Sequence, residues 1–284
     1  MINLDNNIDN NDFEIDYFGQ PFFEGYSFYE VDKIVNDPFG PDSFVQLERL
    51  TPEEYEQIPL LQLAKYLLNL IKTNKEIKLT ATGNLPVKIV KELYGAGFYK
   101  EANIESGLIN LRIESDSLFI SLTKILLLIS PVVKKRKNIL SLTKGGERIM
   151  EDDHELLKTL LLVMGKEFNW AFFDAYPDDM IMVGKIGFIY SLYLMGRYGD
   201  EVRPSTFYFK KYYTAMEGYF DDLQETESAS RCYELRTFSR FLDYFGLIQI
   251  HKQQILPPLE VVKKPLFDRL FTIRKHSLFL EQKK

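Results

Sequence analysis

Two long apolar stretches constrain the fold of this chain more than any other feature of its sequence. Residues 118–133 contain one charged side chain, Lys124, and residues 180–195 also contain one, Lys185. A helix that crosses a membrane needs about 20 consecutive apolar residues, and both stretches fall short of that length. They therefore predict two buried helices of a globular fold.

The composition supports a globular protein and restricts its partners. The chain has 284 residues, of which 45% are hydrophobic and 27% charged, so there is room for two or three domains. The net charge of −6 argues against a surface that binds nucleic acid over its whole extent. A single cysteine, Cys232, excludes an internal disulfide and any cysteine-based metal site. The acidic, Asn-rich start differs from a signal peptide, and we expect a soluble protein of the cytoplasm.

The first 48 residues predict a disordered tail at 1–16 and an aromatic-rich arm at 17–48, which packs its rings on a neighbouring domain or chain. The spacing of acidic and amide residues between Asp5 and Asp16 partly matches a calcium loop. Asn10 stands where such a loop needs glycine, so a solvated tail is the better account.

Residues 49–150 alternate helices with short strands. Thr51-Pro52-Glu53-Glu54 is a capping box, and apolar residues at helical spacing follow from Leu60 to Ile71. A strand at 77–80 and a helix at 86–94 come next. A helix at 115–129 then leads into a hairpin formed by residues 132–135 and 139–143, and a further helix starts at Asp152.

Two phrases within these residues are alike. Leu79-Thr80-Ala81-Thr82-Gly83 and Leu142-Thr143-Lys144-Gly145-Gly146 both follow a predicted helix and strand, and both precede a helix. They predict two copies of one unit, repeated after about 63 residues, the difference between positions 79 and 142. We expect a helical insert at 151–227, with helices near 154–168, 179–197 and 205–220. A third copy at 228–284 has strands at 247–251 and 255–262 and a last helix from Pro265.

The helix, hairpin and Leu-Thr-x-x-Gly turn resemble winged-helix domains, and residues 139–146 are similar to the end of a second wing strand. With the phrases Leu79–Pro86 and Arg112–Asp116, they look like a family of uncharacterised bacterial proteins, some plasmid-borne and some carrying a SEC-C motif. The resemblance implies a mainly α fold with short β-hairpins, in tandem winged-helix-like units, and no established activity. The SEC-C zinc site needs several cysteines, which this chain lacks.

The predicted hairpin carries the strongest basic feature of the sequence. Four consecutive cations lie at its tip and two more follow it: Lys134, Lys135, Arg136, Lys137, Lys144 and Arg148. Such a cluster can contact phosphates without reading base sequence. It can also be a solvated edge that discourages aggregation of strands, or a surface for an acidic protein.

A winged-helix protein that reads DNA places polar side chains on the helix before the wing. The helix at 115–129 offers only Lys124 among long polar residues, so it suits burial better. The helix of the third copy carries Arg231, Arg236 and Arg240, with Glu234 and Asp243 opposing a contact with phosphate.

Catalytic and metal-binding patterns are weak. The acidic run Glu151–Glu155 fits charge at a helix start better than a metal site, although it includes His154. Asp174, Asp178 and Asp179 fit a loop and a helix cap better than a carboxylate pair. Cys232 lies on an apolar helix stripe, as a core residue would. No nucleophile elbow, phosphate loop or dinucleotide fingerprint is found, and we expect no cofactor.

We therefore expect a non-catalytic interaction module that binds protein or associates with itself. Two alternatives stay open: a DNA-binding regulator that uses the basic wing, and an enzyme with an unrecognised site. The DNA alternative requires the cations of 134–137 and the three arginines to share one exposed face. It loses support if ion pairs engage them.

Overall fold

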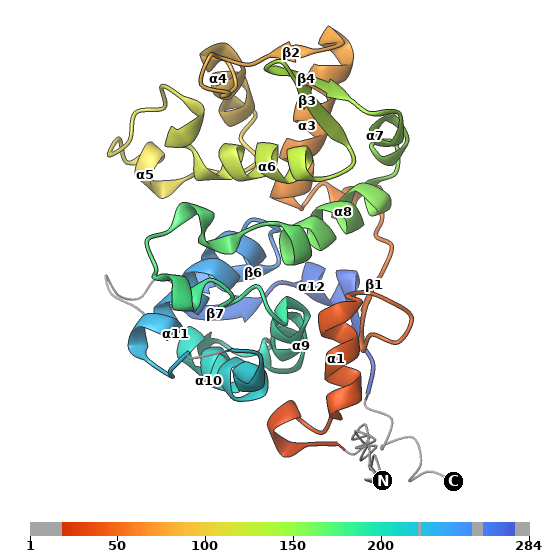
Figure 1. The fold of residues 1–284 in the computed structure, drawn as a ribbon, viewed down its shortest axis with the longest axis vertical. Helices are drawn as coiled ribbons and strands as arrows, with labels where there is room; N and C mark the ends of the chain where they lie inside the picture. Colours follow the sequence, from red (N-terminus) through yellow and green to blue (C-terminus); the bar gives the residue numbers. More distant parts are fainter. Residues whose placement is uncertain (1–18, 221–222, 252–257, 276–284) are drawn as a thin grey trace, which may run out of the picture.

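The structure is a computed structural model that describes residues 19–220, 223–251 and 258–275 (Figure 1). Its described part is mainly helical with small antiparallel sheets, as predicted. The expected tail at 1–16, with its partial calcium-loop spacing, lies outside the described residues, as does the start of the strand predicted at 255–262. No helix of the described ranges is long and apolar enough to cross a membrane.

A first unit forms the upper part of Figure 1. Its three main helices are α3 (Pro59–Asn74), α4 (Val87–Gly95) and α6 (Leu118–Ile129). Its antiparallel sheet has the order β2-β4-β3, formed by β2 (Ile77–Lys78), β3 (Val133–Arg136) and β4 (Ile139–Leu142). Three short helices complete it: α2 (Pro52–Tyr55), α5 (Ala102–Glu105) and α7 (Lys144–Ile149).

A second unit, in the lower part of Figure 1, repeats the same order of elements. Helix α9 (Phe188–Tyr198), strand β5 (Arg203–Pro204) and helix α10 (Ser205–Met216) come first. Helix α11 (Glu227–Tyr233) continues directly into a π-helix, η7 (Glu234–Leu242). Strands β6 (Ile248–His251) and β7 (Glu260–Lys263) then close a sheet of order β5-β7-β6.

The predicted 63-residue repeat is wrong. Strand β2 pairs with β4 in one sheet, so both Leu-Thr-x-x-Gly phrases belong to the same unit. The two phrases also differ in structure. Gly83 has a φ of +84° in a turn, whereas Gly146 lies in α7, where its amide donates to the Oγ1 of Thr143. The partner of the first unit lies instead at 188–263, because β5, from the expected insert, pairs with β7.

The prediction of one helix over 179–197 is wrong in its first half. Residues 181–187 form turns, and α9 starts only at Phe188. Gly184 and Gly187 have φ values of +80° and +61°, a left-handed conformation that ends regular helix and favours glycine. A Cβ at Gly187 would also lie 2.4 Å from the Sδ of Met216, so the turn allows α9 to approach α10 closely.

The aromatic arm packs on the second unit, as predicted. Helix α1 (Phe28–Asn36) begins at a capping box made by Ser27 and Glu30. Tyr26 precedes this helix in the chain and Phe44 follows it. Both rings meet Tyr193 of α9 edge to face, with centroids 5.1 Å from Tyr193 for Tyr26 and 5.4 Å for Phe44. Strand β1 (Val45–Leu47) pairs with β8 (Phe271–Ile273), which follows α12 (Pro265–Leu270).

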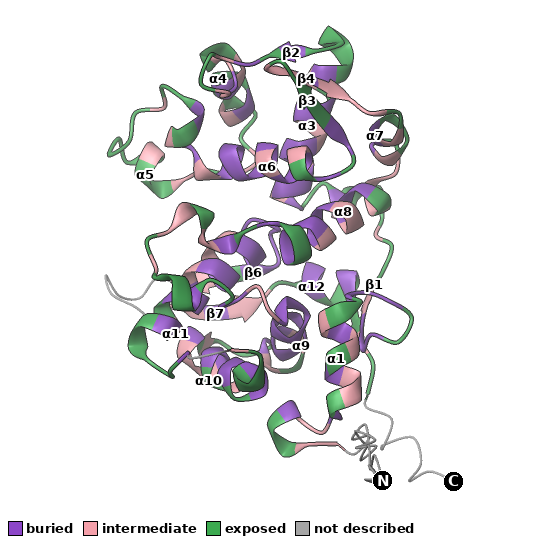
Figure 2. Cartoon of the chain, viewed as in Figure 1, coloured by how far each residue is buried: buried purple, intermediate pink, exposed green. Residues whose placement is uncertain are grey.

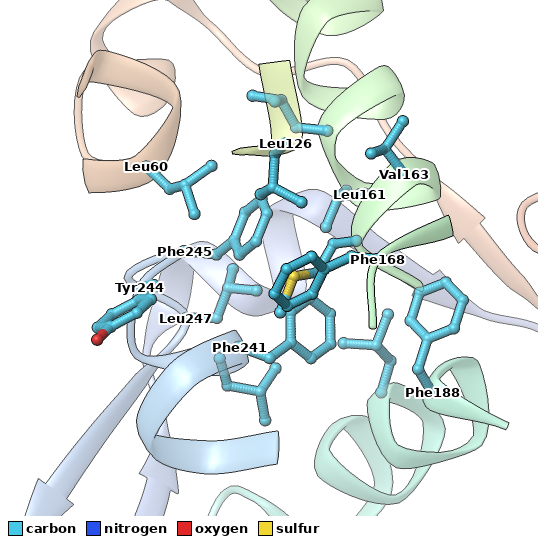
Figure 3. Packing of buried hydrophobic residues seen from close by; sticks show 14 of the residues in the cluster. Leu60, Leu126, Leu161, Val163, Phe168, Phe188, Phe241, Tyr244, Phe245 and Leu247 are labelled. Carbon is cyan, nitrogen blue, oxygen red and sulfur yellow. The ribbon is translucent and has the colours of Figure 1, made fainter. Parts of the chain in front are cut away.

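The two units share one hydrophobic core. Helix α8 (Asp153–Leu162) and the π-helical turn η3 (Val163–Glu167) run between them, and Figure 2 shows buried residues on both sides of α8. Figure 3 shows Leu126 of α6 above Phe245 and Leu247 of the second unit. The backbone amide of Leu60 donates to the carbonyl of Tyr244, 3.0 Å away, so main chain as well as side chains joins the units.

Candidate functional site

The basic hairpin β3–β4 presents a cationic face. Lys134 pairs with Ser141, Arg136 pairs with Ile139, and Lys78 of β2 also pairs with Ile139. Because paired residues of antiparallel strands project from the same side of a sheet, Lys78, Lys134 and Arg136 share one face. All three are exposed. Sequence reasoning missed Lys78, because only the pairing of β2 with β4 brings it beside the hairpin.

The tip of the hairpin adds charge through a tight turn. Lys137 and Asn138 have φ values of +49° and +59°, as the two central residues of a type I′ turn do. Such a turn matches the twist of the two strands and holds the exposed Lys137 at the end of the ribbon. The backbone carbonyl of Asn138 accepts a hydrogen bond from the amide of Leu79 at 2.8 Å, which connects this turn to the end of β2.

The remaining cations differ in direction. Lys135 pairs with the buried Leu140, on the sheet side opposite to Arg136, and its Nζ lies near Gly83. Lys144 and Arg148 are exposed on α7. Across the described ranges, none of the six predicted cations of this region forms an ion pair, so the whole group is open to a partner.

Helix α6, which precedes the hairpin, is buried. Lys124, its one long polar side chain, is 8% exposed and lies 2.5 Å from the carboxylate of Glu114, which is 5% exposed. Its Nζ also donates to the carbonyl of Gly83, and Glu114 accepts from the amide of Leu85. The charged pair therefore fixes the turn before α4, and α6 offers no polar face to a partner.

The prediction of a surface contact is wrong for Arg236 and Arg240, two of the three arginines. Arg236 is 1% exposed, and its guanidinium donates to Asp174 and to the carbonyls of Met180 and Val183. Arg240 donates to the carbonyl of Phe173 and lies 3.7 Å from the same aspartate. Both guanidiniums hold the 170–183 segment against η7, and their side chains are only 0% and 14% exposed.

Arg231 is exposed but paired. Its Nη2 lies 2.5 Å from the carboxylate of Glu227, one helical turn earlier in α11. The three arginines therefore do not extend the basic hairpin into one cationic surface, and ion pairs engage each of them.

The acidic run at 151–155 caps and anchors α8. Asp152 accepts from the backbone amides of His154 and Glu155, while Lys65 and Lys72 pair with Asp153 and Glu151. Burial lowers the pKa of His154, whose Nδ1 lies 3.3 Å from the hydroxyl of Tyr55. Within the described residues no group of three or more His, Cys, Asp or Glu side chains is arranged to hold a metal ion.

The side chains weighed as catalytic candidates do not converge. Asp174 contacts Arg236 of the second unit, whereas His154 contacts Tyr55 of the first. Cys232 is fully buried, and burial raises the pKa of its thiol to about 12, as expected for a core residue. The basic hairpin is thus the clearest charged contact surface of the predicted candidates.

Functional assignment rests on this geometry. No protein-family model, curated protein or solved structure matches the chain.

Proposed function

We propose that the protein is a non-catalytic interaction module built from two winged-helix-like units. Each unit has the order helix, strand, helix, helix, hairpin. In each sheet the first strand lies beside the second strand of the hairpin. This order and the basic hairpin support the winged-helix reading and the resemblance to the bacterial family with such units. The interaction itself is with protein.

The observation that carries the proposal is the burial of the third helix in both units. In winged-helix proteins that read DNA, this helix enters the major groove. Here α6 packs against the second unit, and the ring of Phe119 lies 5.0 Å from that of Tyr244. In η7, Arg236 and Phe238 are buried. Helices that are buried in this way cannot enter a groove, which favours binding of protein over reading of base sequence.

The loop between α5 and α6 is the best candidate for the protein contact. Leu108 is 79% exposed, and its neighbours Ile109 and Ile113 are 38% and 47% exposed. Clusters of exposed apolar residues on a folded protein mark interaction surfaces, since each otherwise orders water at a cost in free energy.

Site-specific photo-crosslinking tests this assignment. A photoreactive residue at Leu108 should give a discrete adduct in cells, and the same residue at Thr73, an exposed position of α3, should not. Sedimentation of the purified protein from 1 to about 100 µM, a range that covers weak interfaces, separates self-association from a second protein. A monomer at every concentration, with equal labelling from positions 108 and 73, would remove the loop as an interface.

Contact with phosphates through the basic hairpin is the second candidate function. It is favoured by the cationic face of Lys78, Lys134 and Arg136, whose charges have no ion-pair partner within the described ranges. Without a free reading helix, such a contact would be independent of base sequence.

A salt titration with random duplex DNA decides this second candidate. Binding should weaken steeply with salt, and the Lys134→Ala/Arg136→Ala variant should lower the slope of log K against log salt by about 1 per lost contact. The matched control is Lys210→Ala/Lys264→Ala, which removes two exposed lysines of the second unit. No binding at low salt, or equal loss in both variants, would exclude the hairpin as a phosphate contact.

A further inference from the structure

A pocket of about 540 Å³ lies where the aromatic arm, α9 and β8 meet, far along the chain from the basic hairpin. Its volume falls in the range of small-molecule sites, about 300–1,000 Å³. Three chain segments close it, and its main polar and aromatic lining is Glu24, Tyr26, Tyr193, Arg197, Arg274 and Lys275.

The lining carries an excess of positive charge. Arg197, Arg274 and Lys275 face one acidic residue, Glu24, which is already engaged. Lys211 lies 2.5 Å from one of its carboxylate oxygens, and the Nε of Arg197 lies 3.4 Å from the other. Although burial alone would raise the pKa of Glu24, its hydrogen bonds and these cations lower that pKa, so the carboxylate stays charged and satisfied. Arg274 and Lys275 form no ion pair within the described residues, so these two cations are available to an anion.

A buried hydroxyl adds a donor. Tyr193 is 2% exposed, and its hydroxyl lies beside the guanidinium of Arg197 but donates to no acceptor within the described residues. Burial raises the pKa of Tyr193, which keeps its proton in place. Buried hydroxyls are nearly always hydrogen-bonded, because an unmade bond costs about 1–3 kcal/mol. A ligand in the pocket would supply the missing acceptor.

The frame of the pocket is rigid. The hydroxyl of Tyr26 donates to the backbone carbonyl of Arg274, and the Nη1 of Arg274 donates to the carbonyl of Pro41. Gly196 permits the close approach of α9 to β8, since a Cβ there would lie 2.9 Å from the Cγ1 of Ile273. Arg274 is thus placed by the fold before any ligand arrives, which lowers the entropy lost on binding.

We propose that this pocket binds a small organic anion, a carboxylate or a phosphate ester, whose charged group meets Arg274 and Lys275 and accepts from the Tyr193 hydroxyl. The ring of Tyr26 and the side chain of Ile273 contact the apolar body of the ligand. This site is independent of the interaction surfaces proposed above.

Calorimetric titration of the full chain with inorganic phosphate and with citrate, at constant ionic strength in chloride, tests the site. We expect saturable binding of at least one anion. Binding of phosphate alone assigns the phosphate class, and binding of citrate alone assigns the carboxylate class. Absence of binding for both would overturn the proposal.

Three variants locate the anion. Tyr193→Phe removes only the hydroxyl and should weaken binding by about fivefold, the worth of one hydrogen bond, while the fold is unchanged. Tyr208→Phe is the matched control, because its hydroxyl is also buried and donates to no acceptor in the described part of the chain but does not line the pocket. Lys275→Gln, at an exposed position, should also weaken binding.

Two results would contradict this location. Equal affinity of the wild type, Tyr193→Phe and Lys275→Gln would show that the anion binds elsewhere. Loss of binding in Lys134→Ala/Arg136→Ala would assign the anion to the basic hairpin, whereas the proposed site predicts unchanged affinity in that variant.

Discussion

The guanidinium of Arg236 lies 2.8 Å from the carboxylate of Asp174, and their side chains are 0% and 3% exposed. Because the pair is withdrawn from water, loss of one partner leaves the other charge buried without compensation. Removing one partner of a buried ion pair lowers the free energy of unfolding by about 3–5 kcal/mol. Replacing the whole pair by apolar side chains of similar volume costs far less.

We therefore expect Arg236→Met to lower the free energy of unfolding by about 3–5 kcal/mol. Arg231→Met, which breaks an exposed pair with Glu227, should change it by less than about 1 kcal/mol. Urea denaturation followed by circular dichroism measures both. Similar losses in the two variants would contradict the structural role assigned to Arg236.

The same pair predicts a dependence of stability on acid. Burial alone would raise the pKa of Asp174, but its hydrogen bonds and the charge of Arg236 lower it below the ordinary value of 3.8. A carboxyl group whose pKa is lower in the folded protein than in the unfolded chain stabilises the fold. This stabilisation is complete above the pKa of the unfolded chain, and it is lost as the pH falls through the pKa of the folded protein. The stability difference between wild type and Asp174→Asn should stay constant from about pH 7 to 5 and shrink below 3.8. An unchanged difference at pH 3 would refute this prediction.

The glycines of the second Leu-Thr-x-x-Gly phrase should differ sharply. A Cβ on Gly146 would lie 2.0 Å from the carbonyl oxygen of Val132, whereas one on Gly145 meets only the Thr143 Oγ1 at 3.7 Å. Because backbone cannot give way cheaply, Gly146→Ala should cost about 2 kcal/mol or more. Gly145→Ala should be neutral or slightly stabilising, since alanine favours helix. Thermal unfolding of both variants measures the contrast, and equal melting temperatures would contradict it.

The cations of the hairpin should contribute little to folding. Lys134 and Arg136 are exposed, and no ion pair within the described ranges involves them. Replacing both with alanine should change the free energy of unfolding by less than about 0.5 kcal/mol. The same denaturation experiment checks this, and a larger loss would mean that any effect on binding reflects the fold.

Cys232 should be protected in the native protein. It is fully buried, and burial raises the pKa of its thiol to about 12, so little thiolate exists at neutral pH. We expect no reaction with a thiol-specific chromogenic reagent until denaturant is added, when one thiol per chain should react. Rapid labelling of the native protein would show that α11 opens readily.

Local patterns in the sequence predicted most single elements. The capping box at Thr51, the helix predicted at 115–129, which begins at Leu118, and the hairpin around Lys137 all appear in the structure, because each depends on residues close together in the chain. The predicted repeat of about 63 residues was wrong for the same reason. Leu79-Thr80 and Leu142-Thr143 look alike, but the pairing of β2 with β4 is a long-range contact that no local pattern encodes.

The candidate site was predicted only in part. The hairpin cations were found from their run in the sequence, but Lys78 joins them through sheet pairing alone. Arg236 has the spacing of a surface helix residue, and its partner Asp174 lies 62 positions earlier. Whether such an arginine faces water or the core depends on tertiary packing, and so does the pocket around Tyr193.

The pairing of β1 with β8 has a consequence for synthesis on the ribosome. Val45 and Ile273 are register partners, so the arm cannot be sealed onto α9 until residue 273 has emerged from the exit tunnel. Until then β1 has no partner strand, and Tyr26 lacks the carbonyl of Arg274 to which its hydroxyl donates. Closing so long a loop costs only slightly more entropy than closing a short one, because the cost grows with the logarithm of loop length. The delay in docking the arm is therefore kinetic, because it is set by the time that translation needs to reach residue 273.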